Sequence, residues 1–188
     1  MRLRSTVAFF ATAGLSVALL GAKASPDEQR EKIRKMAATT LTDLYKLQPT
    51  ARTAVQNSAG YAVFSNMGTN VLLLSTARGA GVAVNSKTKQ DTFMKMISAG
   101  VGLGVGVKDY RVVFVFENEQ ALGKFINSGW AGETQADAAA KTKTSGGAYS
   151  GATMVASGVW VYQITKKGLA LQVTLQGTKY SKNDELNK

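Results

Sequence analysis

Cysteine and histidine are both absent from the 188 residues of this chain. Without cysteine, the chain can form no disulfide and no zinc–thiolate site, and it offers no thiol nucleophile. Without histidine, it lacks the commonest general base of enzymes and the commonest ligand of transition metals. The sequence therefore predicts a fold held together by core packing alone, with no metal site and no cofactor.

The residues that are present give little indication of a catalytic site. Glu117 and Glu119, the closest approach to a carboxylate pair, flank Asn118, which is suited to cap a helix. The segment 147–151 lacks the spacing of a nucleophile elbow, and a serine triad needs a histidine. A serine–lysine dyad, which requires only spatial proximity, stays open. We therefore expect a protein that is not an enzyme and has no catalytic residues.

Positive charge is the main compositional feature. Lysine and arginine number 23 against 12 aspartates and glutamates, which gives a formal net charge of +11. A basic surface of this kind favours anionic partners such as phospholipid headgroups, acidic polymers or nucleic acid. Hydrophobic residues make up 45% of the chain, so its length and composition favour one domain with a substantial core.

The first residues have the pattern of a secretory signal peptide. Arg2 and Arg4 precede the apolar run 7–20, and Ala22 and Ala24 place small residues where a signal peptidase cleaves. An uncleaved membrane anchor is the alternative, although the apolar run is shorter than the about 20 residues that a spanning helix needs. We expect residues 1–24 to be removed.

The expected mature chain is not a lipoprotein. Leu19-Leu20-Gly21 is followed by Ala22 rather than by cysteine, so no acyl chain can be attached there. Removal of Arg2, Arg4 and Lys23 lowers the net charge from +11 to about +8. We expect a periplasmic or secreted protein whose membrane contact is peripheral and for which nucleic acid is not a partner.

An amphipathic helix is predicted directly after the signal peptide. Ser25-Pro26-Asp27-Glu28 has the spacing of a capping box with proline at the first helical position. Apolar residues then recur at helical spacing until Pro49, and 50–57 can form a short second helix. The segment 27–48 either docks on a sheet with its charged face in solvent or lies on an anionic membrane, and both arrangements can hold together.

From Gly60 the pattern changes to short apolar runs separated by turns, which predicts an antiparallel sheet. The segment 118–127 interrupts these runs with an apolar stripe at helical spacing. The predicted class is α+β: one or more N-terminal helices packed on a strongly twisted sheet that can curl towards a barrel, with one further helix inserted near 118–127. Residues 25–58 and 59–180 form one globular unit in this interpretation, and 181–188 form a frayed polar tail. Strands are expected at 61–64, 71–75, 79–84, 92–98, 100–107 and 112–116, followed by a last hairpin of 152–165 and 169–176.

The most unusual local pattern is the alternation of glycine with apolar residues at 100–107. In a strand, Gly100, Gly102, Gly104 and Gly106 would all lie on one face and leave it without side chains. Such a face lets another backbone or a ligand approach closely. Packing against the protein's own elements is the simpler interpretation, and contact with a ligand is the alternative.

Basic residues gather in the predicted first helix and at predicted turns. Each lysine or arginine near an anionic surface contributes about 1 kcal/mol, so four or five can hold a protein reversibly at a membrane without a pocket. For any single one of them, general solubility is a sufficient explanation. The candidate headgroup-binding residues are Arg30, Lys32, Arg34, Lys35, Arg78, Lys87, Lys89, Lys166 and Lys167.

Several segments, in this order along the chain, resemble the SYLF (Ysc84-like) family and its bacterial exported members. They are Gly60-Tyr61-Ala62-Val63-Phe64, Arg78-Gly79-Ala80-Gly81-Val82, the glycine-alternating run, Ala121-Leu122-Gly123-Lys124-Phe125 and Lys167-Gly168-Leu169. The resemblance implies phospholipid binding, with phosphoinositides and actin filaments as ligands of eukaryotic members. It also places the family's basic N-terminal segment at residues 30–35.

Charge, export signal and family resemblance lead to one functional hypothesis. The chain is expected to be a non-enzymatic envelope protein that associates peripherally with anionic phospholipid through a basic surface. The alternative is a structural or interaction protein that binds an envelope polymer or a protein partner.

Overall fold

The computed structural model describes residues 24–66, 76–99, 110–132, 147–165, 167–170, 175 and 177–188. Within these residues, three α-helices and a short 3-10 turn accompany one antiparallel sheet of nine strands. The helices are α1 (Pro26–Leu47), α2 (Thr50–Gln56) and α3 (Glu119–Ser128), and the 3-10 turn is η1 (Gly147–Tyr149). The strands are β1 (Gly60–Ser65), β2 (Thr76–Asn85), β3 (Asp91–Ala99), β4 (Tyr110–Phe116), β5 (Trp130–Ala131), β6 (Thr153–Ala156), β7 (Val159–Thr165), β8 (Gly168–Leu169) and β9 (Thr178–Lys182).

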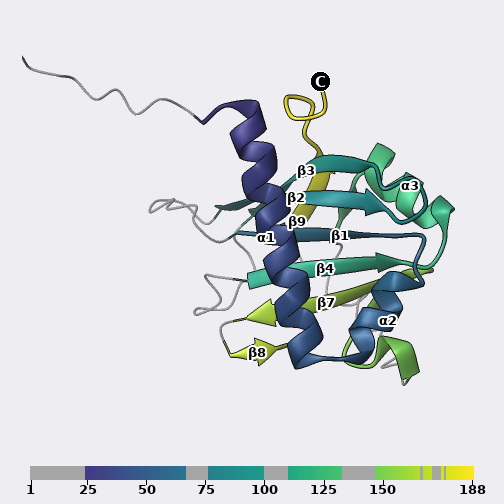
Figure 1. Ribbon diagram of the computed structural model, residues 1–188. Helices are drawn as coiled ribbons and strands as arrows, with labels where there is room; N and C mark the ends of the chain where they lie inside the picture. The colour runs from purple at the N-terminus through teal and green to yellow at the C-terminus, as the bar shows by residue number, and fades with distance from the viewer. Residues whose placement is uncertain are drawn as a thin grey trace, which may run out of the picture.

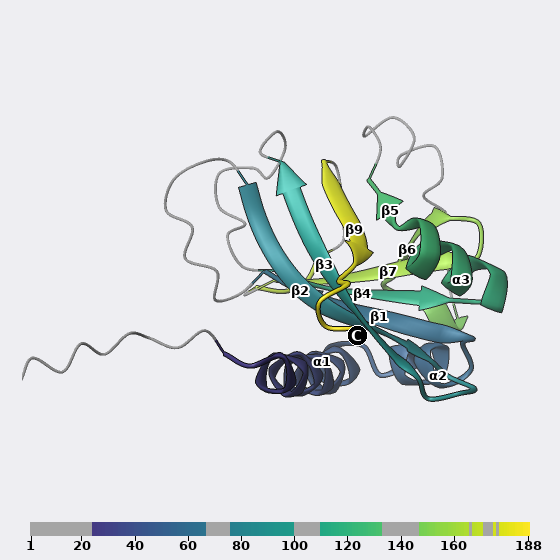
Figure 2. The ribbon, with the colours of Figure 1, turned by 90° about the horizontal axis from the view of Figure 1, so that it is seen from above.

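The sheet curls, so that it has an outer and an inner face. Its strand order is β5-β9-β3-β2-β1-β4-β7-β6, with β8 paired to β7. Helix α1 crosses the strands on the outer face (Figure 1), and α3 lies on the other side of the sheet (Figure 2). The ends of β2, β3 and β9 curve away from α1 (Figure 2). The predicted α+β class, with a docked first helix and a third helix inserted between strands, is confirmed.

The start of α1 has the predicted capping box. The Ser25 hydroxyl accepts a hydrogen bond from the Glu28 backbone N–H at 3.2 Å, and the Glu28 carboxylate accepts one from the Ser25 backbone N–H at 2.7 Å. Both bonds satisfy backbone donors that have no partner inside the helix. The helix ends at Leu47, before Pro49, and α2 follows where a short second helix was expected.

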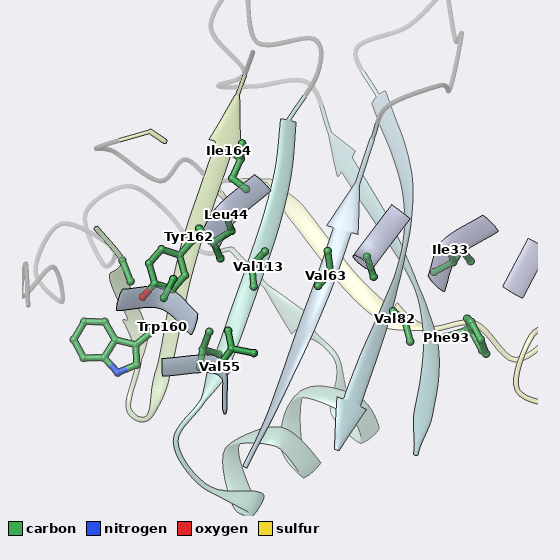
Figure 3. Close-up of a cluster of buried hydrophobic side chains, with 14 of the residues drawn as sticks. Ile33, Leu44, Val55, Val63, Val82, Phe93, Val113, Trp160, Tyr162 and Ile164 are labelled. Carbon is green, nitrogen blue, oxygen red and sulfur yellow. The ribbon is translucent and has the colours of Figure 1, made fainter. Parts of the chain in front are cut away.

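The outer core lies between α1 and the sheet (Figure 3). Ile33, Ala37 and Leu44 are buried at a spacing that puts them on one side of α1. They pack on a row of residues that the strand register places side by side on the outer face. This apolar row consists of Phe93, Val82, Val63, Val113 and Tyr162. The docked arrangement of α1 is the one that the structure shows.

The inner core fills the concave side and is rich in aromatic rings. Phe64, Phe114 and Phe116 from the sheet meet Phe125 of α3 and Tyr180 of β9, and all five are buried. The ring centroids of Phe114 and Phe125 lie 4.9 Å apart, a separation at which aromatic pairs attract each other. These contacts hold α3 against the inner face of the curled sheet.

Helix α3 is bounded by residues that suit its two ends. The Asn118 side chain accepts a hydrogen bond from the Ala121 backbone N–H at 2.9 Å, as the sequence predicted. Gly129 ends the helix with a φ of 72°, a conformation that side-chain-bearing residues rarely adopt. Leu122 and Phe125 are its buried residues, so the predicted apolar stripe faces the inner core.

The last predicted hairpin differs from the structure in its position. Residues 152–165, expected to be one strand, form two strands, β6 and β7, which pair with each other. Gly158 takes a φ of 70° between them, and this left-handed conformation allows the tight reversal. Of the second predicted strand, 169–176, the described residues include the end of β8 (Gly168–Leu169).

The C-terminal residues are folded, and the prediction of a frayed tail at 181–188 is wrong. Strand β9 extends to Lys182 and pairs with β3. Beyond it, the Asn187 side chain accepts a hydrogen bond from the Phe93 N–H at 2.9 Å and donates one to the Phe93 carbonyl at 2.7 Å. Leu186 is buried against the outer core. A polar side chain thus continues the pairing of β3 where β9 ends.

Some predictions fall on parts of the chain outside the described residues. These are the signal peptide up to residue 23, the strand expected at 71–75, the glycine-alternating segment and Lys166. Arg78 lies in β2, where its backbone pairs with β3. In the part of the chain that is described, no helix is both long and apolar enough to cross a bilayer.

Candidate functional site

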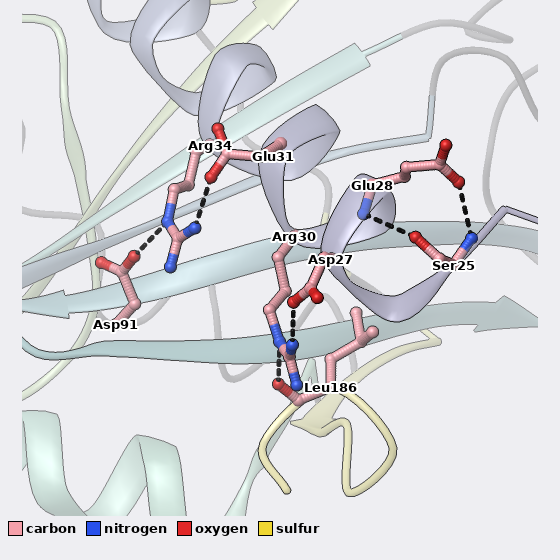
Figure 4. Close-up of polar contacts among 8 residues, drawn as sticks. All are labelled: Ser25, Asp27, Glu28, Arg30, Glu31, Arg34, Asp91 and Leu186. Carbon is pink, nitrogen blue, oxygen red and sulfur yellow. Dashed lines mark hydrogen bonds and ion pairs between the residues drawn. The ribbon is translucent and has the colours of Figure 1, made fainter.

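Two of the predicted headgroup-binding arginines are engaged inside the molecule. Arg30 Nε donates to the carbonyl of Leu186 at 2.9 Å, and a second guanidinium nitrogen lies 2.5 Å from the Asp27 carboxylate (Figure 4). Only 21% of its side chain is exposed. Arg30 therefore joins the start of α1 to the C-terminal residues, and its guanidinium is not presented to an external anion.

Arg34 has a similar role one turn further along α1. It bridges Asp91 of β3 at 2.7 Å and Glu31 of α1 at 2.6 Å (Figure 4). Its guanidinium carbon lies 5.2 Å from the centre of the Phe93 ring. Hydrogen bonds with Asp91, and then with Glu31, raise the pKa of the Arg34 guanidinium. Arg30 and Arg34 thus join α1 to the C-terminal residues and to β3, and their contact with headgroups stays a prediction.

The remaining described arginines also contact other parts of the protein. Arg111 of β4 pairs with Asp43 of α1 at 2.6 Å, and the two side chains are only partly exposed. Arg52 of α2 lies over the Tyr45 ring, 4.6 Å from its centre. Planar guanidinium groups suit such hydrogen-bonded and stacked contacts better than an ammonium does. The Arg111–Asp43 pair was not recognised from the sequence, because its partners lie 68 residues apart along the chain.

The lysines behave differently. Among the residues whose side chains are described, every lysine is exposed, and all the ion pairs are formed by arginines. Lys32, Lys35 and Lys46 lie on the side of α1 that faces away from the buried residues. The lysines are therefore the charges that the folded protein leaves available to a partner.

The other predicted lysines lie at turns, as expected. Lys87 and Lys89 are exposed in the turn between β2 and β3, and Lys89 has a φ of 59°. Lys167 is exposed in the turn between β7 and β8. These positions are at the ends of strands, whereas Lys32 and Lys35 lie along α1. The structure thus groups the predicted lysines by element and does not gather them in one pocket.

Two further exposed lysines were missed in the sequence. Lys95 of β3 and Lys179 of β9 lie on the outer face, because Lys95 alternates with the inward-facing Met94 and Met96 and Lys179 precedes the inward-facing Tyr180. The alternation of Phe93, Lys95 and Ile97 against the two methionines was visible in the sequence. What was not visible is that α1 covers Phe93 but leaves the next two outer positions exposed.

Carboxylates that were considered for catalysis have structural partners. Glu117 accepts a hydrogen bond from the Trp160 indole N–H at 2.8 Å. Glu119 accepts one from the Asn85 side-chain amide at 2.9 Å. Among the described residues, no group of three or more carboxylates is placed to hold a metal ion.

These features define a class of protein: a curled antiparallel sheet with helices on both faces and with lysines on its exposed outer side. Residues 97–188 match the family model Ysc84, which is described as "Las17-binding protein actin regulator". Residues 97–188 thus carry the SYLF (Ysc84-like) domain, which confirms the family resemblance that the sequence motifs indicated.

One relative is similar over most of the chain. Beta cell expansion factor A of Aeromonas veronii is 38% identical over 162 residues, which cover 81% of this chain and 57% of that protein. The chain thus spans little more than half of the relative's length.

Proposed function

We propose that this chain is a non-enzymatic protein that binds anionic phospholipid at a membrane surface through its exposed lysines. The observation that carries this proposal is the division of the basic residues. Arginines are used to hold α1 and α2 in place, while the lysines with described side chains point to solvent without an ion pair. A net charge of +11 therefore includes many charges that are not neutralised within the fold.

Helix α1 contributes lysines to the lipid-binding surface while it stays docked on the sheet. Its buried residues include Ile33 and Leu44, and Lys32, Lys35 and Lys46 lie on its opposite side. Basic residues near an anionic surface contribute about 1 kcal/mol each, so three lysines supply roughly 3 kcal/mol before other contacts are added. Such binding is reversible and depends on ionic strength, because the charges are exposed to solvent.

The test is co-sedimentation with lipid vesicles. Binding is expected to vesicles that contain phosphatidylglycerol or cardiolipin, and it should weaken as salt is raised. Vesicles of phosphatidylcholine serve as the neutral control. Equal binding to neutral and anionic vesicles would overturn the proposal, and so would the absence of binding to both.

The variant to compare with the wild type is Lys32→Glu/Lys35→Glu. It is preferable to changes at Arg30 or Arg34, since these arginines hold α1 to the rest of the fold. Affinity for anionic vesicles should fall while the melting temperature stays unchanged. Lys124→Glu, an exposed lysine on α3, is the single-site control from the other side of the sheet.

We also propose that the protein acts outside the cytoplasm. The basis is the signal-peptide pattern of residues 1–24, in which Ala22 and Ala24 precede the expected cleavage site. Sequencing of the N-terminus of the protein recovered from cells should begin at Ser25. A recovered protein that still begins at Met1 would contradict this part of the proposal.

A protein partner is the second candidate function, because the family model's own description names a binding protein. Capture of one stoichiometric protein from the envelope, combined with no binding to any vesicle, would favour it over the lipid proposal.

A further inference from the structure

The outer face of the sheet is divided into a covered and an uncovered part. Under α1, the register joins Phe93, Val82 and Val63 in an apolar row that is buried. Two residues further along β3, the outer row is polar and basic. Its members, from β9 to β4, are Ser181, Lys95, Ala80, Ser65 and Arg111. Helix α1 borders this second row through the ion pair of Asp43 with Arg111.

The next row along the strands contains an exposed apolar side chain between basic positions. Ile97 of β3 is 43% exposed, and in the described part of the chain only Leu47 is another large hydrophobic residue exposed to this degree. The register partner of Ile97 on one side is Lys179, and its partner on the other side is Arg78. Lys95 lies two residues before Ile97 and therefore on the same face.

We propose that Lys95, Ile97 and Lys179, here called the β3–β9 strip, form the part of the protein that contacts an anionic lipid surface. The inference rests on the proposed function and specifies where that function resides. In this arrangement Ile97 enters the interface between headgroups and acyl chains, while the two lysines stay at the level of the phosphates.

The charge around the strip is complementary to such a surface. Across the sheet, the register neighbours of Lys95 are Ala80 and Ser181, and the second neighbour of Lys179 is Ala131. None of these positions carries a carboxylate, whereas Lys32 and Lys35 share α1 with Glu28 and Glu31. In the described part of the chain, these register neighbours do not neutralise the positive charge of the strip, and Ile97 adds an apolar group that a purely electrostatic site would not need.

The shape of the sheet also favours the strip as a contact. The ends of β2, β3 and β9 curve away from α1 (Figure 2), and on β3 the two outer residues beyond Phe93, Lys95 and Ile97, are exposed. A single exposed apolar residue is common on protein surfaces and by itself carries no conclusion. Here it is flanked by two lysines on paired strands, and the pairing fixes the backbone positions of the three residues relative to one another.

The first experiment compares two variants with the same change of net charge, Lys95→Glu/Lys179→Glu and Lys32→Glu/Lys35→Glu. Each basic residue at an anionic surface is worth about fivefold in affinity, so the strip variant should bind phosphatidylglycerol vesicles at least roughly 30-fold more weakly than the wild type. The α1 variant should lose clearly less. Thermal unfolding of both variants is measured to show that the fold is unchanged.

The second experiment uses the absence of cysteine, which makes a single introduced cysteine a unique labelling site. Ile97→Cys and Lys124→Cys are each labelled with a fluorophore that responds to polarity. On addition of phosphatidylglycerol vesicles, emission from the label at position 97 should shift to the blue and increase. The label at position 124, on the exposed side of α3, should not change.

The possible results separate the inference from the proposed function. If the wild type binds anionic vesicles but the strip variant binds equally well and the label at 97 stays unchanged, the strip is not the contact and the inference is wrong. If the wild type binds no anionic vesicle, the proposed function itself fails. Binding that is lost equally in both double variants, with no change of the label, would show attraction by overall charge and would also overturn the inference.

Discussion

The two faces of the curled sheet differ in how they are used. The inner face is filled by aromatic rings from β1, β4 and β9, which meet Phe125 of α3. The outer face is apolar where α1, α2 and Tyr149 of η1 pack on it, whereas on β3 it presents the exposed Lys95 and Ile97. The inner face thus forms a buried core, whereas the outer face combines a core with exposed side chains.

This difference leads to a clear expectation for substitutions. Changes on the inner face should act on the free energy of unfolding, because the side chains there are closely packed and have no exposed part. Changes at exposed lysines of the outer face should act on binding and leave stability almost unchanged. Arginines at the edge of α1 should lie between these extremes, since their contacts are partly exposed.

The largest effect is expected for Phe114→Ala in the inner core. Phe114 is fully buried and contacts the rings of Phe64, Phe125 and Tyr180. Loss of this ring should lower the free energy of unfolding by about 3–5 kcal/mol, measured by urea denaturation. Phe114→Leu, which keeps most of the volume, is the matched control and should cost less. A loss below about 1 kcal/mol for the alanine variant would show that this core is not closely packed.

Ionisation of a tyrosine in the outer core is expected to lower the free energy of unfolding strongly, and only at alkaline pH. Burial raises the pKa of the Tyr162 hydroxyl to about 12, against an ordinary value of 10.0. The unfolded chain therefore loses this proton first, so the stability that is fully present below pH 10 should decline as pH rises towards 12. Urea denaturation of the wild type and of Tyr162→Phe over this range provides the measurement.

The stability of Tyr162→Phe should decline less steeply with rising pH than that of the wild type, but it should still decline. Burial also raises the pKa of Tyr45, Tyr61 and Tyr149, which belong to the same outer core. Identical pH profiles for the variant and the wild type would show that Tyr162 is not the group responsible.

A moderate loss is expected when the C-terminal residues are released from β3. Asn187→Ala removes the two hydrogen bonds between its side chain and the Phe93 backbone. Each bond contributes about 1 kcal/mol, so the free energy of unfolding should fall by roughly 1–3 kcal/mol. Lys188→Ala, at an exposed neighbour, should leave it unchanged. If the two variants were equally stable, the Asn187 side chain would not hold the C-terminal residues in place, as expected for the frayed tail that the sequence predicted.

The smallest effects on stability are expected for single substitutions in α1, and they should differ between an arginine and a lysine. Arg34→Ala removes the ion pairs with Asp91 and Glu31, and because the side chain is 45% exposed the cost should be below about 1 kcal/mol. Lys35→Ala should cost nothing measurable in thermal unfolding, but it should weaken binding to anionic vesicles. The reverse assignment, with stability lost at Lys35 and binding lost at Arg34, would contradict the division of roles proposed here.

Much of the fold was predictable because its signals are local. The capping box at Ser25, the cap at Asn118 and the glycine at 129 mark helix ends through contacts within a few residues. Strands β1, β2, β3 and β4 followed from short apolar runs separated by turns. The reversal at Gly158 was missed, since the apolar run on both sides of it is compatible with one long strand.

The candidate site was predictable only in part. The sequence indicated that the surface is basic and that Lys32, Lys35, Lys87, Lys89 and Lys167 are available, and these five are exposed. It assigned Arg30 and Arg34 to the same role without revealing their distant partners. A charge pattern shows neither the Leu186 carbonyl that Arg30 contacts nor Asp91, which lies 57 residues from Arg34 along the chain. It also passed over Lys95 and Lys179, whose neighbourhood depends on the pairing of β3 with β9.

By itself, the sequence determined the helix boundaries, the alternation of the strands, the basic character and the family resemblance, all of which arise from neighbouring residues or from composition. Only the tertiary structure decided which positive charges are engaged and which are exposed. The reason is physical: an arginine becomes a structural residue when folding brings a distant carboxylate or carbonyl within hydrogen-bonding distance. A lysine stays available when folding leaves it on an uncovered face.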